Sequence, residues 1–140
     1  MPRRPEHRLL PLVLAYLPVP IVGAVLSARW DVGASPDGGP ADMVLRGTAL
    51  TPPLFLPVAL AAAAAAARRE GKVGRIGAGA VCTVAALFMG GSTANLPNDL
   101  AAARAAGTPR ALTVVLAALH LGLAVALLRH AVPRLRWRES

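Results

Sequence analysis

The chain is poor in the residues from which soluble domains are built. Only 16% of its 140 residues are charged and only 4% are aromatic, whereas about a quarter of the residues in soluble domains are charged. The single cysteine, Cys82, excludes an intrachain disulfide and a cysteine-rich metal site. By contrast, 55% of the residues are hydrophobic and the mean hydropathy is +0.53. These proportions exclude a disordered chain and predict a membrane protein.

Acidic residues are scarce as well. Seven Asp and Glu residues stand against fifteen Lys and Arg residues, which gives a formal net charge of +8. In a soluble protein this excess would suggest nucleic-acid binding. Here the basic residues lie between long apolar stretches, so we expect contact with a lipid bilayer and no nucleic acid.

Four apolar stretches are long enough to cross a membrane, because a spanning helix needs about 20 mostly apolar residues. None of them contains Asp, Glu or Lys, and the only arginine among them is Arg75. The backbone of a bilayer-spanning segment must satisfy its own hydrogen bonds, which favours helices. The chain is therefore predicted to be all-α, a four-transmembrane-helix bundle that forms one integral membrane domain over residues 1–140. The four stretches are residues 9–28, 50–67, 73–91 and 111–128.

The basic residues predict the orientation of the bundle. With the N-terminus in the cytoplasm, eleven Lys and Arg residues fall on the cytoplasmic side and four on the outer side. The positive-inside rule selects this arrangement, with both termini cytoplasmic. Abundant alanine, and arginine in place of nearly all lysine, are typical of a high-GC bacterial genome. We therefore expect a multi-pass protein of a bacterial plasma membrane.

The C-terminal tail alternates basic and apolar residues. Arg134, Arg136 and Arg138 are separated by Leu135 and Trp137, just beyond the fourth predicted span. Juxtamembrane basic residues contribute about 1 kcal/mol each at an anionic surface. This pattern favours anionic inner-leaflet lipids as partners, and the alternative is a solvated, frayed terminus.

Small residues recur at four-residue spacing in the third and fourth predicted spans. Such rows let membrane helices approach closely. They predict helix contacts within the bundle, with a second copy or with a partner membrane protein, although alanine and glycine are common enough here to produce rows by chance. The longer row is Gly74, Ala78, Cys82, Ala86 and Gly90, and the shorter is Ala118, Gly122 and Ala126.

Polar side chains inside the spans are few, and the only phenol, thiol and imidazole among them share one depth. From the helical rise, Tyr16, Cys82 and His120 lie about 10–14 Å from the cytoplasmic end. An ionisable residue at the midplane indicates a functional site. We therefore predict a midplane pocket in which His120 and Tyr16 are candidate catalytic residues and Cys82 and Thr83 contact a ligand.

The alternative role for His120 is a structural one, in which its hydrogen bond joins two helices. Pro18 and Pro20 lack the N–H group that would bond the carbonyls of Leu14 and Tyr16. A neutral histidine bonded to a carbonyl freed in this way, or to Tyr16, would simply join helices.

Several activities are excluded. No carboxylate lies in a predicted span, which argues against a proton-coupled exporter of the small four-helix type. His120 and His130 lie about 15 Å apart by helical rise, too far to ligate one haem. The sequence has no metal-ligand cluster, phosphate loop or nucleophile elbow, so we expect no metal and no cofactor.

Residues 94–102, which follow the third predicted span, have the sequence ANLPNDLAA. This stretch is similar to the Asn-x-Pro-x-Asn type element of the anthrone-oxygenase-like family of small bacterial four-helix membrane proteins. The resemblance implies either cofactor-free oxidation of an aromatic metabolite or a shared scaffold. It carries over Asn95 and Asn98 as candidate ligand-binding residues, whose alternative role is helix capping and turn formation. The family's Trp, His and Arg pattern before the fourth helix is replaced here by residues 108–110, Thr-Pro-Arg.

Three functions are compatible with these features. The leading interpretation is an accessory or binding protein for a lipophilic small molecule or for the helices of a partner. The second is a cofactor-free, oxygenase-like membrane enzyme acting on a hydrophobic or aromatic metabolite, with His120 as its acid or base. The third is a transporter or channel subunit. The sequence does not decide whether the protein is an enzyme.

Overall fold

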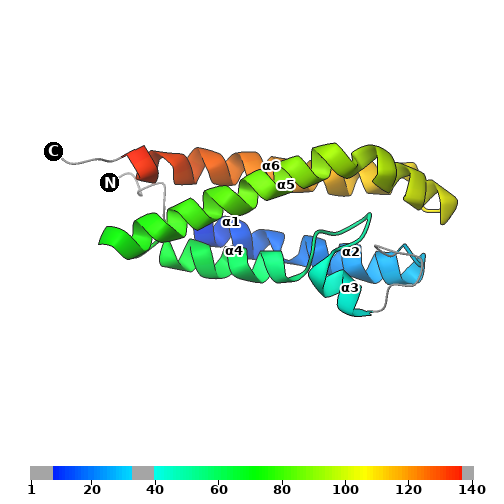
Figure 1. Cartoon of the computed structure of the whole chain (residues 1–140), viewed down its shortest axis with the longest axis horizontal. Coiled ribbons are helices and arrows are strands. Elements are labelled where there is room, and N and C mark those ends of the chain that lie inside the picture. Colours follow the sequence, from blue (N-terminus) through cyan, green and yellow to red (C-terminus); the bar gives the residue numbers. More distant parts are fainter. Residues whose placement is uncertain (1–7, 33–39, 137–140) are drawn as a thin grey trace.

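The computed structural model describes residues 8–32 and 40–136. Within these residues the regular secondary structure is helical, and the one β-bridge is an isolated pairing between Thr48 and Thr51. Figure 1 shows the helices and their labels. They are α1 (Leu9–Tyr16), α2 (Pro18–Arg29), α3 (Pro40–Leu45), α4 (Phe55–Ala66), α5 (Gly71–Ala105) and α6 (Arg110–Arg136).

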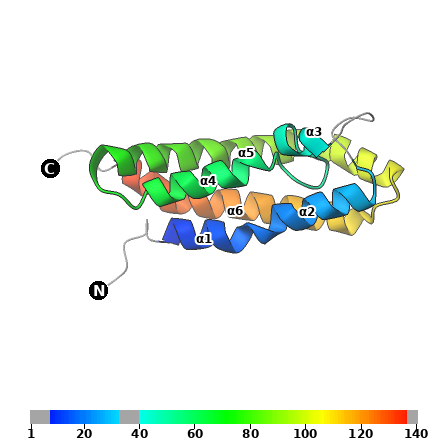
Figure 2. The same cartoon turned by 90° about the horizontal axis from the view of Figure 1, so that it is seen from below.

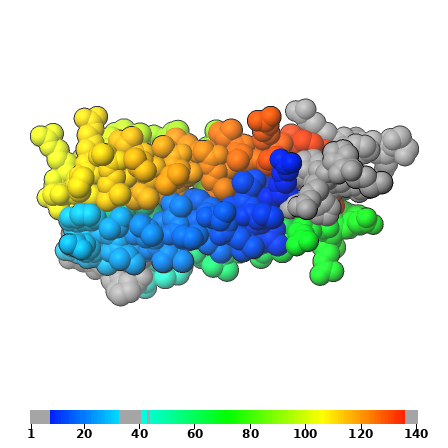
Figure 3. Space-filling view, turned by 180° about the vertical axis from the view of Figure 1, so that it is seen from behind, coloured from blue at the N-terminus to red at the C-terminus, as the bar shows by residue number. Residues whose placement is uncertain are grey.

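The helices form an elongated bundle. In Figures 1 and 2, α1, α2 and α5 run in one direction along it, and α4 and α6 run in the other. The start of α1, the end of α4, the start of α5 and the end of α6 therefore lie at one end of the molecule. Helices α5 and α6 share the largest contact, and Figure 3 shows α1 and α2 lying along α6.

Three helical stretches are long and apolar enough to cross a membrane. They include three of the four predicted spans: α1 and α2 together over Leu9–Arg29, α5 over Gly71–Ala105, and α6 over Arg110–Leu135. The surfaces of these helices expose many large apolar side chains, including Ile21, Val25 and Val115. Such surfaces are suited to contact with lipid.

The predicted second span, residues 50–67, is helical only over α4. This helix has 12 residues, about 18 Å by its rise, which is shorter than the hydrocarbon core. Residues 50–54 are not helical. Pro52 and Pro53 explain this, because proline lacks an N–H donor and disfavours the helical conformation of the residue before it. The prediction of one continuous helix over residues 50–67 is therefore wrong at its first five residues.

The first predicted span is divided at Leu17, between α1 and α2. Pro18 occupies the first position of α2, where a proline's missing N–H costs no helical hydrogen bond. Pro20 follows within the same first turn, and its carbonyl accepts a hydrogen bond from the Thr51 hydroxyl at 3.1 Å. The two prolines therefore bend the helix where it meets the 46–53 loop.

Helices α5 and α6 extend beyond the predicted spans. Helix α5 continues to Ala105 as one helix of 35 residues that includes Pro97, whereas the third predicted span ends at residue 91. Helix α6 continues to Arg136 and includes Pro133, so Arg134 and Arg136 are helical rather than part of a loose tail. Trp137 and Arg138 lie outside the described residues. Hydropathy marks where a helix leaves the apolar region rather than where it ends, and the contact between α5 and α6 supports the helical conformation beyond that point.

The contact between α4 and α5 depends on glycine. A β-carbon at Gly77 would lie 2.4 Å from the Ala67 nitrogen and 2.8 Å from the Ala63 oxygen. The absent side chain therefore lets the two backbones touch. Leu60 and Val81 are fully buried in the surrounding core.

The predicted five-residue row is not a continuous contact face. Gly74 and Ala78 are buried and Cys82 is half-buried, but Ala86 and Gly90 are exposed. A four-residue step advances about 400° around a helix, so a row at this spacing drifts by about 40° per step. In α6, Ala118 and Gly122 of the shorter row are also exposed, and their contact with another helix stays a prediction.

Candidate functional site

A loop formed by residues 46–53 covers one side of the bundle between α3 and α4. Two hydroxyl contacts attach it to α2: Ser27 Oγ lies 2.6 Å from Thr48 Oγ1, and Thr51 Oγ1 donates to the Pro20 carbonyl. The turn at its start requires Gly47, whose φ is +77° and whose β-carbon would lie 2.7 Å from the Pro53 nitrogen. The loop is thus a defined wall rather than a simple connection.

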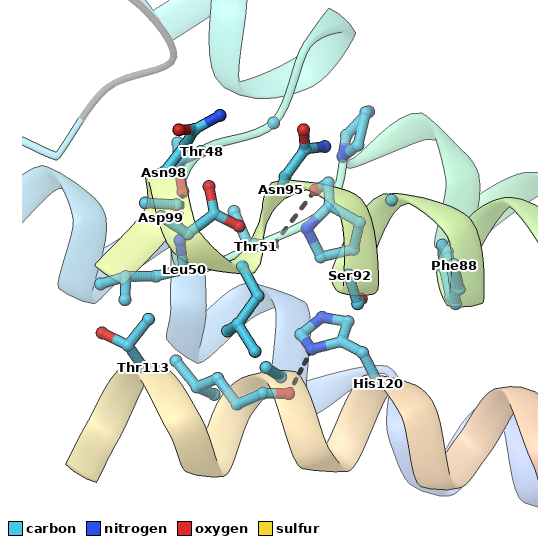
Figure 4. A pocket seen from close by; sticks show the side chains of 18 of the residues that line it. Thr48, Leu50, Thr51, Phe88, Ser92, Asn95, Asn98, Asp99, Thr113 and His120 are labelled. Atoms are coloured by element: carbon cyan, nitrogen blue, oxygen red, sulfur yellow. Dashed lines mark hydrogen bonds between the residues drawn. The ribbon is translucent and has the colours of Figure 1, made fainter. Parts of the chain in front are cut away.

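Beneath this loop lies a cavity of about 370 Å³. Its other walls are the second half of α5 and the first half of α6, as Figure 4 shows. On α5 the lining includes Phe88, Ser92, Asn95 and Asp99, whose spacings of three and four residues place them on one helix face. The cavity is therefore apolar toward Phe88 and increasingly polar toward the end of α5.

His120 of α6 lies at the inner end of this cavity. Its side chain is 5% exposed, and Nδ1 lies 2.5 Å from the Leu116 carbonyl oxygen. A carbonyl can only accept, so in the neutral imidazole Nδ1 carries the proton and Nε2 carries a lone pair. Nε2 is buried and has no hydrogen-bond partner within residues 8–32 and 40–136. In Figure 4 the ring extends from α6 toward the part of α5 that carries Ser92.

Three rings pack together beside the inner end of the cavity, and two of them, those of His120 and Phe88, line it. The centroids of His120 and Tyr16 are 5.6 Å apart, and those of His120 and Phe88 are 6.1 Å apart, both in edge-to-face arrangements. Tyr16 and Phe88 are 6.2 Å apart. Such contacts fix the plane of the imidazole. The Tyr16 hydroxyl is buried, and it has no hydrogen-bond partner among the described residues.

The outer end of the cavity is more polar. The Thr113 side chain is 2% exposed and its hydroxyl has no partner in the described part of the chain. Asp99 is half-buried opposite it, on α5. The guanidinium Nε of Arg46 also lines this end, but it lies 3.6 Å from Asp42.

Among the described residues that line the cavity, Asp99 carries the one carboxyl group. Helix α5 is about 52 Å long by its rise, and the hydrocarbon core is about 30 Å thick. The polar segment after Gly91 therefore extends past the apolar part of the helix and carries Asp99 with it. Burial against the cavity wall raises the pKa of Asp99 to about 6, because desolvation disfavours the charged form.

The predicted site residues do not all meet. His120, Asn95 and Asn98 line the cavity. Tyr16 contacts the His120 ring but is outside the cavity lining. Asn95 and Asn98 lie inside α5, so the capping role considered for them is wrong.

Cys82 and Thr83 lie away from the cavity. Thr83 is exposed and donates to the Gly79 carbonyl of its own helix, while Cys82 packs against the core below. Their depth was estimated from helical rise, which gives no information on the direction a side chain takes around the helix. Phe88, on the next turns of α5, contacts the His120 ring instead.

Sequence reasoning missed Phe88, Thr113 and Asp99. The sequence does carry a signal for the two residues on α5, because Phe88 and Asp99 share one helix face with Ser92 and Asn95. The 46–53 loop carries no comparable pattern, and its place over the cavity follows from tertiary contacts.

In the described residues no group of three or more His, Cys, Asp or Glu side chains is placed to hold a metal ion. Comparisons with protein-family models, with curated proteins and with solved structures found no match to this chain. The resemblance of residues 94–102 to the anthrone-oxygenase-like family therefore stays a prediction.

Proposed function

We propose that this is a four-span protein of a bacterial plasma membrane that binds a lipophilic small molecule in the cavity beside His120. The antiparallel course of the helices supports an even number of crossings with both termini on one side. In this arrangement α4 completes a crossing together with the 46–53 loop. Non-helical backbone at membrane depth is tolerated where it lines a cavity, as this loop does.

The end of the bundle where α1 begins and α6 ends is strongly basic, which supports a cytoplasmic location. Anionic inner-leaflet lipids are the expected partners of this end, since each basic residue near such a surface contributes about 1 kcal/mol. The basic residues that these elements bring to this end are Arg8, Arg68, Arg69, Lys72, Arg75, Arg129 and Arg134.

The observation that carries the binding proposal is the buried Nε2 of His120, which has no protein partner among the described residues. A buried acceptor left without a hydrogen bond costs about 1–3 kcal/mol. A ligand in the cavity that donates to Nε2 would remove this cost. The apolar side chains around it, such as Phe88 and Leu116, suit a lipophilic body.

An enzyme is the second candidate, and the same atom supports it. The Nε2 lone pair can accept a proton from a ligand hydroxyl as well as a hydrogen bond, which is the role of a general base. Tyr16 would then position the imidazole through its ring, since it does not line the cavity. Turnover of a bound aromatic metabolite without added cofactor would distinguish this function from binding alone.

A transporter is less well supported. The cavity lining comes from residues 46–56, 87–102 and 113–120. Below it, toward the basic end, Leu60, Val81 and Leu127 are fully buried in a packed core. The described cavity therefore opens toward one side only.

Adjacent alanines of α6 allow a direct test. Ala117 lines the cavity, whereas Ala118 is exposed on the lipid-facing side. Ala117→Phe should fill the cavity, and Ala118→Phe should leave it unchanged. In native mass spectrometry of protein purified from membranes, we expect a co-purifying small molecule with the wild type and Ala118→Phe but not with Ala117→Phe. An identical set of bound molecules in all three proteins would refute the proposal.

A further inference from the structure

We propose that the ligand is an elongated amphipathic cation, with a hydrogen-bond donor at its inner end and a protonated amine at its outer end. This inference rests on the proposed function, since it describes the occupant of the same cavity. It follows from the polar groups that the cavity offers at its two ends. The acceptor at the inner end is Nε2 of His120 and the acceptor at the outer end is the Asp99 carboxyl group, and neither has a hydrogen-bond partner within the described residues.

The inner end selects a donor. Because Nδ1 of His120 is bonded to the Leu116 carbonyl, Nε2 is the ring nitrogen left to accept a hydrogen bond, and His120 is one of the residues that line the cavity. A ligand acceptor such as a carbonyl or carboxylate would meet the lone pair of Nε2 unfavourably. A hydroxyl, and a phenol in particular, would donate to it and pack its ring against Phe88.

The outer end selects a positive charge. Asp99 lines the cavity, and within the described residues its carboxyl group has neither an ion pair nor a hydrogen bond. Among the described residues, the other charged side chain in the lining is that of Arg46, whose guanidinium lies 3.6 Å from Asp42. In Figure 4 the Asp99 carboxyl group points away from α6, on the side of α5 where Thr51 of the 46–53 loop is labelled. Its partial burial strengthens attraction to a cation, since the field is less screened there.

Helix geometry sets the length of the ligand. Thr113 precedes His120 by seven residues on α6, and Asp99 follows Ser92, which lies over His120 in Figure 4, by seven residues on α5. Two helical turns correspond to about 10 Å. The walls between these levels include Leu96 and Leu116, so the middle of the ligand is apolar.

A matched set of probes tests this inference. In 4-(3-aminopropyl)phenol, a phenol and an amine stand about 10 Å apart, the separation that the helical rise gives. The neutral 4-propylphenol lacks the charge, and 3-(4-hydroxyphenyl)propanoate reverses it. Binding of each is measured by calorimetry in neutral detergent. We expect the amine to bind the wild type at least about tenfold more tightly than the anion, the range of a hydrogen bond to a charged group.

Two isosteric substitutions test whether the preference for the amine over the anion depends on the Asp99 carboxyl group. Asp99→Asn should reduce the ratio between amine and anion to about twofold or less, because an amide retains the shape but not the charge. Asp31→Asn makes the same change in charge at the same end of the molecule, outside the cavity lining, and should leave the ratio unchanged. A thermal melt of each variant establishes that it is folded.

The outcomes separate this inference from the proposed function. Saturable binding of the neutral phenol with equal affinities for amine and anion would overturn the cation but retain the binding site. An unchanged ratio in Asp99→Asn would overturn the role of that carboxyl. If none of the probes binds, this inference fails, and the comparison of Ala117→Phe with Ala118→Phe decides separately whether the cavity binds a ligand.

Discussion

The imidazole of His120 has its chemistry fixed by its own helix. The carbonyl of Leu116, one turn earlier, takes the proton of Nδ1 and leaves Nε2 as an acceptor. Tyr16 and Phe88 hold the ring from two other helices through edge contacts. The residue is therefore not the link to a carbonyl freed by proline that the sequence allowed as an alternative. The orphaned Nε2 is the observation on which the proposed binding site rests.

Asp99 leads to a prediction on pH. Its folded-state pKa of about 6 lies above the ordinary 3.8, so the folded protein binds a proton more readily than the unfolded chain. The resulting stabilisation is fully present below pH 3.8 and is lost as the pH rises through about 6. We expect the wild-type melting temperature in detergent to fall by about 3 °C between pH 5 and pH 7.

Asp99→Asn is the control for this pH effect, because it removes the titrating group and keeps its shape. The variant should lose most of the decrease in melting temperature. Parallel pH profiles for the wild type and the variant would show that Asp99 is not desolvated in the folded state.

For single residues, the sequence predicted His120 as part of the candidate site but not the side chains that surround it. The scarcity of polar residues in apolar stretches singled out His120, which lines the cavity. Helical rise placed Cys82 at a similar depth, but a rotation of 100° per residue determines which side chain faces inward. On α5 that side chain belongs to Phe88. The rotation is set by packing of whole helices, which one residue's neighbours in sequence do not encode.

Among the elements, hydropathy predicted the apolar centres of the helices better than their ends. Helix α5 runs past the predicted boundary although residues 92–99 include Pro97 and several poor helix formers. Its long contact with α6 supports the helical conformation there. Helix α6 continues beyond Leu128 into a more polar segment. The opposite error affects α4, where residues 50–54 are apolar but contain two prolines. A segment's preference for lipid and its ability to form a helix are separate properties. They differ at one end each of α4, α5 and α6.

Two glycines of α5 test the α4–α5 contact. Gly77→Ala should destabilise the bundle by about 1–3 kcal/mol, because its methyl group would overlap backbone atoms of Ala67 that have no freedom to move. Gly79→Ala meets nothing within 4 Å and should be neutral or stabilise the helix by about 0.5–1 kcal/mol. Melting temperatures in detergent compare the two directly. Equal loss of stability in both would argue against close backbone packing at Gly77.

At the scale of the whole molecule, the proposed orientation predicts which turns reach which side. Ala105, at the end of α5, should lie outside the cell, and Glu70, in the basic turn between α4 and α5, should lie inside. Both residues are exposed. With Cys82→Ser as the background, a membrane-impermeant thiol reagent should label Ala105→Cys on intact cells. It should label Glu70→Cys only after lysis.

The reversed labelling pattern would invert the orientation. Labelling of both positions on intact cells would mean that α5 does not separate the two compartments. The second result would contradict the crossing itself, which depends on the length and apolar centre of this helix.

The attachment of the 46–53 loop has a consequence for kinetics. Two hydrogen bonds join the loop to α2, Ser27–Thr48 and Thr51–Pro20, and each contributes about 1 kcal/mol net. The buried Leu50 and Thr51 also pack closely against Gly23 of α2, so the detached loop is a minor state. A ligand that enters beneath the loop would bind only this minor state, which lowers its association rate in proportion. Compounds that fit the cavity differently should differ mainly in how long they stay, and therefore in their dissociation rates.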